Sequence, residues 1–169
     1  MDAFADLLAA NAAYAAHFAL GDLDAPPRRH LAVVTCMDCR IDPLAILGLE
    51  PGDAHILRNA GARVTPDVLR SLVKSVLQLG VSQVVVMAHS DCGAAKIVLA
   101  DLRARVLDAT GNDPVDVEFH LIADPDATLR LDVETLCDHP YLPAGVDVLG
   151  LYYDVTSGVA APVVTAVIG

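Results

Sequence analysis

Short apolar runs alternate along this chain with longer segments whose apolar residues recur at helical spacing. The runs predict strands over 31–36, 54–58, 84–88, 146–153 and 161–168, the last at the edge of a sheet. The first and third runs are rich in Val, which is typical of strands buried on both faces. Helical spacing predicts helices over 43–49, 65–80, 92 to about 108, and 126–138. This alternation favours an α/β fold with a mostly parallel β-sheet flanked by helices.

Local sequence signals support two of these boundaries and leave one segment open. Thr65, Pro66 and Asp67 combine an N-cap residue, a proline at the first helical position and an acid in the first turn. Gly80 then predicts the end of that helix. The pattern over 115–123 predicts either a strand or a short helix and does not decide between them.

The N-terminal residues 2–20 are rich in Ala, with apolar residues at helical spacing, and Gly21 and then prolines follow them. They predict a helix joined to the first strand by the polar linker 22–30. Such a helix either packs on its own domain or reaches across to a partner subunit, and the pattern does not decide between these. A length of 169 residues fits one domain over 1–169.

Composition narrows the function classes. The chain has 11 Lys and Arg against 22 Asp and Glu, a formal net charge of −11, which disfavours binding to nucleic acid or anionic membranes. No run reaches the roughly 18 to 20 apolar residues of a membrane span, and the first residues lack the basic cluster of a signal peptide. Four cysteines in such a chain indicate reduced thiols or metal ligands, so we expect a cytoplasmic protein.

Reactive side chains follow two of the predicted strands. Cys36 ends the run 31–36, and His89 and Cys92 follow the run 84–88. The carboxyl ends of parallel strands meet at one edge of a sheet, where open α/β folds place their sites. Thiolate and imidazole groups are preferred ligands of zinc, and a catalytic zinc uses three protein ligands and keeps one position open. The sequence therefore predicts a zinc site formed by Cys36, His89 and Cys92.

Asp38 and Arg40 lie beside this predicted site. If the extended geometry continues past Cys36, the two side chains point to the same side. They then form either a structural ion pair or a catalytic pair. In the catalytic pair, Arg40 keeps Asp38 ionised and directs it at the open position of the metal.

Cys39 leaves other interpretations open. Cys36 and Cys39, together with His89 and Cys92, also have the spacing of a closed Cys₃His structural zinc site in a non-catalytic dimer. A redox pair of Cys36 and Cys39 is less favoured, because the acid between the two thiols raises their pKa. Continued extended geometry predicts instead that Cys39 is buried as a small apolar side chain, away from Asp38.

Three motifs together resemble those of the β-class carbonic anhydrases. They are Cys36-x-Asp38-x-Arg40, Arg58-Asn-Ala-Gly61 and His89-x-x-Cys92-Gly93. The resemblance covers nearly the whole chain, whose short length is similar to the compact, archaeal-type (cab-type) branch. The chain departs from the family in having Cys39 at a position that is usually Ser or Ala, and Ala88 at one that is commonly Gly. It also lacks the Gln that the plant-type branch carries before its first zinc cysteine.

The resemblance implies reversible hydration of carbon dioxide to bicarbonate at a zinc ion held by Cys36, His89 and Cys92. Zinc-bound hydroxide attacks carbon dioxide, and Asp38, which is held by Arg40, orients the hydroxide. In some members of the family this Asp is instead a fourth zinc ligand at low pH. The resemblance further implies a homodimer in which the N-terminal helix clasps the neighbouring subunit. Hydrolysis of carbonyl sulfide or carbon disulfide is the alternative activity, because relatives with that activity share every motif.

Overall fold

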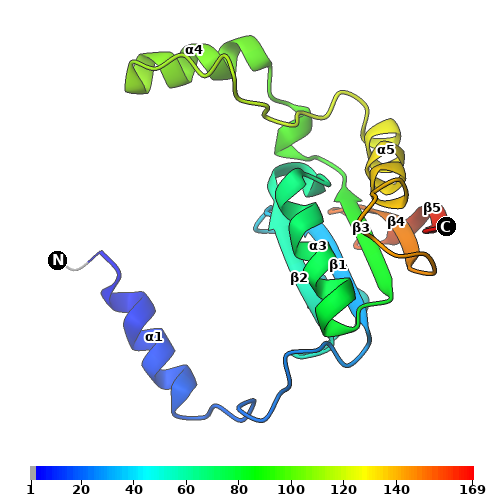
Figure 1. Cartoon of the computed structure of the whole chain (residues 1–169). Helices are drawn as coiled ribbons and strands as arrows, with labels where there is room; N and C mark the ends of the chain where they lie inside the picture. Colours follow the sequence, from blue (N-terminus) through cyan, green and yellow to red (C-terminus); the bar gives the residue numbers. More distant parts are fainter. Residues whose placement is uncertain (1–2) are drawn as a thin grey trace.

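The computed structural model describes residues 3–169 and contains one five-stranded sheet (Figure 1). Its strands are β1 (Leu31–Cys36), β2 (Ala54–Asn59), β3 (Gln83–His89), β4 (Asp147–Tyr153) and β5 (Ala160–Val167). Their order is β2-β1-β3-β4-β5, with β5 antiparallel to β4 and the other neighbours parallel. The five predicted strands and the mostly parallel sheet are confirmed, and no strand boundary differs from the prediction by more than one residue.

The register of the sheet brings the chemically active ends of β1 and β3 together. Thr35 of β1 pairs with Met87 of β3, and its Oγ1 donates a hydrogen bond to the Met87 carbonyl at 3.0 Å. Cys36 pairs with Asn59 on the other side, at the end of β2. The residues that follow these three strands therefore leave the sheet along one edge, which is where open α/β sheets place their sites.

Helices cover both faces of the sheet, as predicted. On one face lie α3 (Pro66–Leu79) and α5 (Pro125–Cys137), and on the other lies the short helix α2 (Pro43–Leu47). The first face buries Ala32, Val34, Val68, Leu72, Val84, Val86, Leu129, Val133, Leu136 and Val148. The second face buries Val33, Ile41, Val85, Met87, Ile122 and Leu151. Alternate residues of β1 and β3 thus enter opposite cores, which explains the continuous apolar runs of these strands in the sequence.

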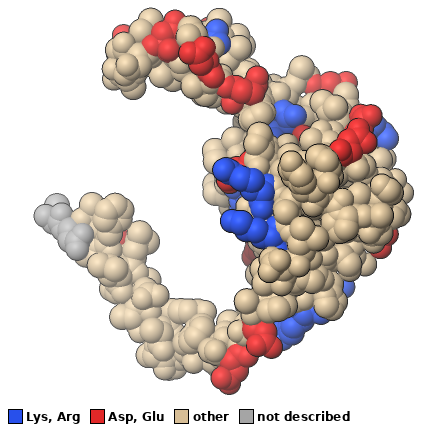
Figure 2. All heavy atoms as spheres, viewed as in Figure 1, with Lys and Arg blue, Asp and Glu red and all other residues tan. Residues whose placement is uncertain are grey.

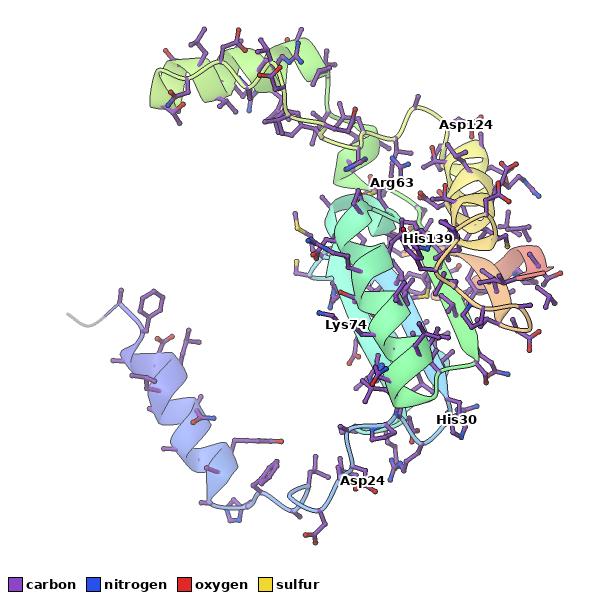
Figure 3. The ribbon with its side chains drawn as sticks, viewed as in Figure 1. Asp24, His30, Arg63, Lys74, Asp124 and His139 are labelled. Atoms are coloured by element: carbon purple, nitrogen blue, oxygen red, sulfur yellow. The ribbon has the colours of Figure 1, made fainter. Side chains whose placement is uncertain are left out.

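The ends of these helices follow the sequence signals. The Thr65 hydroxyl accepts a hydrogen bond from the Val68 amide at the start of α3, and Gly80 ends that helix with a left-handed φ of 72°. His30 lies close to this end, and its Nδ1 is 2.8 Å from the Gly80 carbonyl oxygen (labelled in Figure 3). At the start of α5, the Asp124 carboxylate caps the amides of the first turn.

Two predictions for the middle of the chain are corrected. The continuous helix over 92 to about 108 is wrong: residues 96–98 separate a 3₁₀ turn, η2 (Gly93–Ala95), from α4 (Leu99–Thr110), and Val98 among them is extended. The adjacent β-branched residues Ile97 and Val98 explain the break, because such side chains are restricted in a helix. Segment 115–123 forms neither the strand nor the helix that its pattern allowed.

Two helical segments project from the body of the sheet on the same side (Figure 1). One carries α1 (Ala5–Ala15), which is shorter than the predicted helix over 2–20 and has no buried residue; residue 2 lies outside the described residues. The other carries α4, which likewise has no buried residue. Figure 2 shows open space between the two projections. None of the helices within residues 3–169 is both long and apolar enough to cross a membrane.

Candidate metal centre

Two thiols and one imidazole meet at the carboxyl edge of the sheet. Cys36 is the last residue of β1, His89 is the last residue of β3, and Cys92 follows three residues later. Their ligand atoms all lie within 4.8 Å of one another, and the two Sγ atoms are 4.0 Å apart. All three side chains are buried. The predicted convergence of these residues is therefore present in the fold.

The Arg-Asn-Ala-Gly motif supports the first of these thiols. Its glycine, Gly61, lies in the 3₁₀ turn η1 (Ala60–Ala62) after β2, and its amide donates to Cys36 Sγ at 3.3 Å. Gly61 has a φ of 86°, and a Cβ there would lie 2.9 Å from Ile122 Cδ1. Its left-handed conformation favours glycine, and an added Cβ would require neighbouring side chains to shift.

The imidazole of His89 is oriented by its own turn. Its Nδ1 lies 2.8 Å from the Ser90 carbonyl oxygen, and because a carbonyl only accepts, Nδ1 must carry the proton. Nε2 then presents a lone pair, and this buried atom has no hydrogen-bond partner among the described residues. A buried polar atom without a partner requires an explanation, and a bound cation provides one.

The donor set fits a zinc ion. Burial raises the pKa of the Cys92 thiol, and the adjacent Cys36 adds to that effect. A divalent metal supplies the positive charge that favours the thiolate form of a coordinating cysteine. Two soft sulfur ligands and one neutral imidazole form a Cys₂His set, and such a set is a known catalytic zinc arrangement that leaves a fourth position for water or substrate.

Asp38 and Arg40 pair directly beside this group. Arg40 donates to the Asp38 carboxylate from its backbone amide at 2.9 Å, from Nε at 3.0 Å and from Nη2 at 2.7 Å. These bonds hold the pKa of Asp38 well below its usual range and raise that of Arg40. Asp38 Oδ2 also lies 4.0 Å from His89 Nε2, so an ionised carboxylate faces the candidate metal position.

The predicted pairing of Asp38 with Arg40 is present, but the reason given for it is wrong. The extended backbone ends at Cys36, and a turn follows in which the Ile41 amide donates to the Asp38 carbonyl at 3.1 Å. The turn, and not strand alternation, brings the two side chains together. Arg58 holds the same turn by donating to the carbonyl oxygens of Cys36 at 2.9 Å and Asp38 at 2.7 Å.

The same turn corrects the prediction for Cys39. Its side chain is exposed and is not buried among apolar neighbours, because the strand alternation that predicted burial has already ended. Cys39 is also outside the group of residues whose ligand atoms converge. A closed Cys₃His site would require this thiol in the group, so the geometry favours a three-ligand set.

Other polar contacts around the site had no clear signal in the sequence. Arg63, labelled in Figure 3, donates to the buried Asp132 carboxylate at 2.7 Å and to the His120 carbonyl at 3.0 Å. This pair anchors the irregular segment 115–123, whose Ile122 packs on Gly61. The partners are 69 residues apart in the sequence, so neither periodicity nor motif spacing could have indicated the contact.

A second carboxylate, Asp91, also contacts Arg40, at 2.8 Å, although it carries no motif signal beyond its place between His89 and Cys92. Lys96 and Arg40 together lower its pKa to about 2. Asp91 is therefore ionised, and it extends the Asp38–Arg40 pair away from the metal ligands.

Comparison with known proteins finds a matching family model and several related sequences. The family model described as carbonic anhydrase matches residues 31–117, which include the whole candidate site. Beta-carbonic anhydrase 1 of Mycobacterium tuberculosis is 36% identical over 155 residues, covering 90% of this chain and 93% of that protein. Carbon disulfide hydrolase of Acidianus sp. strain A1-3 is 31% identical over 154 residues, covering 77% of this chain and 75% of that protein.

A solved structure extends this similarity to the fold. The crystal structure of carbonic anhydrase from Streptococcus mutans matches with a TM-score of 0.91 and 40% identity, covering 97% of this chain and 99% of that chain. The sheet, the arrangement of Cys36, His89 and Cys92, and the family match over 31–117 agree with one another. The chain belongs to the carbonic anhydrase family, in its β class.

Proposed function

We propose that this chain catalyses the reversible hydration of carbon dioxide to bicarbonate, with zinc held by Cys36, His89 and Cys92. The observation that carries the proposal is the meeting of two buried thiols with an unpartnered imidazole nitrogen, beside a carboxylate that Arg40 keeps ionised. When bound, zinc lowers the pKa of water and so supplies a hydroxide nucleophile near neutral pH. Zinc is also the metal of the β-carbonic anhydrases.

Asp38 then acts as the orienting group. An ionised carboxylate accepts hydrogen bonds and donates none, so Asp38 accepts the hydrogen of the attacking hydroxyl group. A lone pair of the hydroxyl oxygen is then free to attack the carbon of carbon dioxide. Three hydrogen bonds from Arg40 fix the position of this carboxylate. They also favour a free Asp38 over one that serves as a fourth metal ligand, because ligation would break them.

The space beside two of the candidate ligands is small in one subunit. A cavity of about 10 Å³ lies against His89 and Cys92, with Ala88, Ile122 and Leu129 among its apolar lining residues. A volume of this size accommodates about one water molecule. Ala88 occupies a lining position here and so limits the room beside His89.

Hydrolysis of carbon disulfide or carbonyl sulfide is a second candidate activity. The observation that favours it is the similarity to the carbon disulfide hydrolase of Acidianus sp. strain A1-3. The substrates are all small linear molecules with an electrophilic carbon, so the same residues could act on each.

We also propose that the chain works as one catalytic domain, 1–169, within a cytoplasmic homodimer or a larger homo-oligomer. Helix α1 supports the dimer, because its apolar side chains Leu7, Leu8 and Tyr14 are 58–63% exposed in one subunit. All four cysteines are free, which supports a reducing compartment.

The experiment that tests the proposed function is stopped-flow hydration of carbon dioxide by the zinc-loaded protein. Consumption of carbon disulfide and carbonyl sulfide is measured in parallel on the same preparation. We expect carbon dioxide to give the highest kcat/KM of the three. Zinc-loaded protein without any hydration activity would contradict the proposal, and a higher kcat/KM for either sulfur compound would favour the second candidate.

A further inference from the structure

Arg40 binds two carboxylates, of which the proposed mechanism uses only Asp38. On its other side, Nη1 donates to Asp91 Oδ2 at 2.8 Å and Nη2 donates to the Asp91 carbonyl at 3.2 Å. The Lys96 ammonium binds the remaining carboxylate oxygen of Asp91. Asp38, Arg40, Asp91 and Lys96 therefore form a chain of four charges that alternate in sign and lead from the candidate metal position to the surface.

The backbone of Asp91 shows that this contact depends on a particular local conformation. Asp91 has a φ of 56°, in the left-handed region that side chains other than glycine rarely adopt and that Asp and Asn tolerate best. It lies between the candidate ligands His89 and Cys92, in a turn that the Ser90 amide ties to the Tyr153 carbonyl at 2.8 Å. Unusual backbone conformations of this kind cluster where a side chain must be placed for function.

We infer that Asp91 and Lys96 are positioning residues that hold the Arg40 guanidinium against Asp38. The Arg40 side chain is 45% exposed. If Asp38 were its one carboxylate partner, Nη1 would face solvent and the guanidinium could rotate away from Asp38. The guanidinium is planar, with five donors in fixed directions, so a second carboxylate on Nη1 restricts its rotation. Lys96 occupies the other Asp91 oxygen and keeps that carboxylate in place.

This inference rests on the proposed function for its kinetic consequence. Exposed ion pairs contribute little to stability, so the expected effect is on geometry. Because Asp38 orients the nucleophile, a mobile Arg40 lowers kcat while KM and zinc content stay the same. The Lys96 side chain is 63% exposed, and it is linked to the site by its ion pair with Asp91.

The kinetic test uses Lys96→Met and Asp91→Asn, since Asn also tolerates the left-handed backbone. We expect each to lower kcat for carbon dioxide hydration about tenfold at unchanged KM and zinc content, and Lys96→Arg to restore it. Arg130→Met is the matched control, because it removes an exposed ion pair, with Asp126 on α5, that is outside the site. Its kcat should equal that of the unmodified protein.

A second readout does not depend on activity. The Arg40 Nε proton is bonded to Asp38 Oδ1, and its exchange with solvent can be followed by ¹⁵N NMR. We expect this exchange to be several-fold faster in Lys96→Met than in the unmodified protein. The inference would be overturned if kcat were unchanged in both Lys96→Met and Asp91→Asn and the exchange rate were unchanged in Lys96→Met. A fall in kcat in proportion to a loss of zinc would also overturn it. If the unmodified protein hydrates no carbon dioxide, the proposed function fails, and the exchange rate alone decides the inference.

Discussion

At the scale of single residues, the site depends on which polar atoms have a hydrogen-bond partner within the protein and which do not. His89 Nδ1 is bonded to its own turn while Nε2 is buried without a partner, so the imidazole is prepared for one further contact. Asp38 is held by Arg40 and needs no metal to be ionised. The ligands and the orienting carboxylate can therefore be separated by mutation.

Asp38→Ala and Arg40→Ala should each lower carbon dioxide hydration by about 10- to 100-fold while zinc content stays the same. The reason is that these residues orient the nucleophile in the proposed mechanism, while they lie outside the set of converging ligand atoms. Activity and metal content are measured on the same preparations. Undiminished turnover in both variants would show that the pair is structural.

Hydration should increase with pH, with a midpoint above about 7, the value for a three-His zinc site. Two anionic thiolate ligands weaken the metal as a Lewis acid, so hydroxide forms at higher pH. The pKa of Asp38 is lowered in the fold, so the residue stays ionised in this range and loses its charge only far below about pH 4. A pH–rate profile that is already flat at about pH 6.5 would contradict this expectation.

At the scale of elements, turns after the strands place the chemistry. The sequence was sufficient to predict the strands and the convergence of Cys36, His89 and Cys92, because apolar runs ending in Cys36 and His89 indicate a shared sheet edge. It was not sufficient for Cys39, because strand alternation ceases at Cys36 and nothing in the pattern shows the turn. The contacts of Arg63 with Asp132, and of Arg40 with Asp91, join residues 69 and 51 positions apart, and only the fold brings such residues together.

Gly61→Ala should destabilise the protein by roughly 1–3 kcal/mol and weaken zinc binding. The new Cβ would meet Ile122 Cδ1 at 2.9 Å and displace the amide that donates to Cys36 Sγ. Gly111→Ala is the matched control, because Gly111 has a φ of 75° but nothing within 4 Å of an added Cβ. Urea unfolding and zinc content are compared, and equal effects of the two substitutions would show that packing at Gly61 is unimportant.

At the scale of the whole molecule, one feature left unexplained by a single subunit is the projecting segment with α1. Residues 1–27 contain no Lys or Arg, and the surface of this segment is largely uncharged (Figure 2). An apolar helix without buried residues gains stability by packing on another surface. The proposed homodimer supplies that surface.

Replacing Leu7 and Leu8 together by Asp should therefore shift the protein toward monomers. Both side chains are more than 60% exposed in one subunit, so the substitutions should leave the fold of that subunit intact. Sedimentation velocity measures the change in mass. Leu131→Asp places a charge at an exposed leucine of α5 and serves as the control. A dimer that persists in the double variant would show that α1 is not the contact.

The most direct test compares two cysteines of the same region. Zinc content and carbon dioxide hydration are measured for the unmodified protein, Cys92→Ser and Cys39→Ser. We predict about one zinc per chain and full activity in the unmodified protein and in Cys39→Ser, whose exposed position makes the substitution nearly neutral for stability. Cys92→Ser should lose most of its zinc and its activity. Full zinc occupancy in Cys92→Ser, or loss of zinc in Cys39→Ser, would contradict the assignment of Cys36, His89 and Cys92 as the metal ligands.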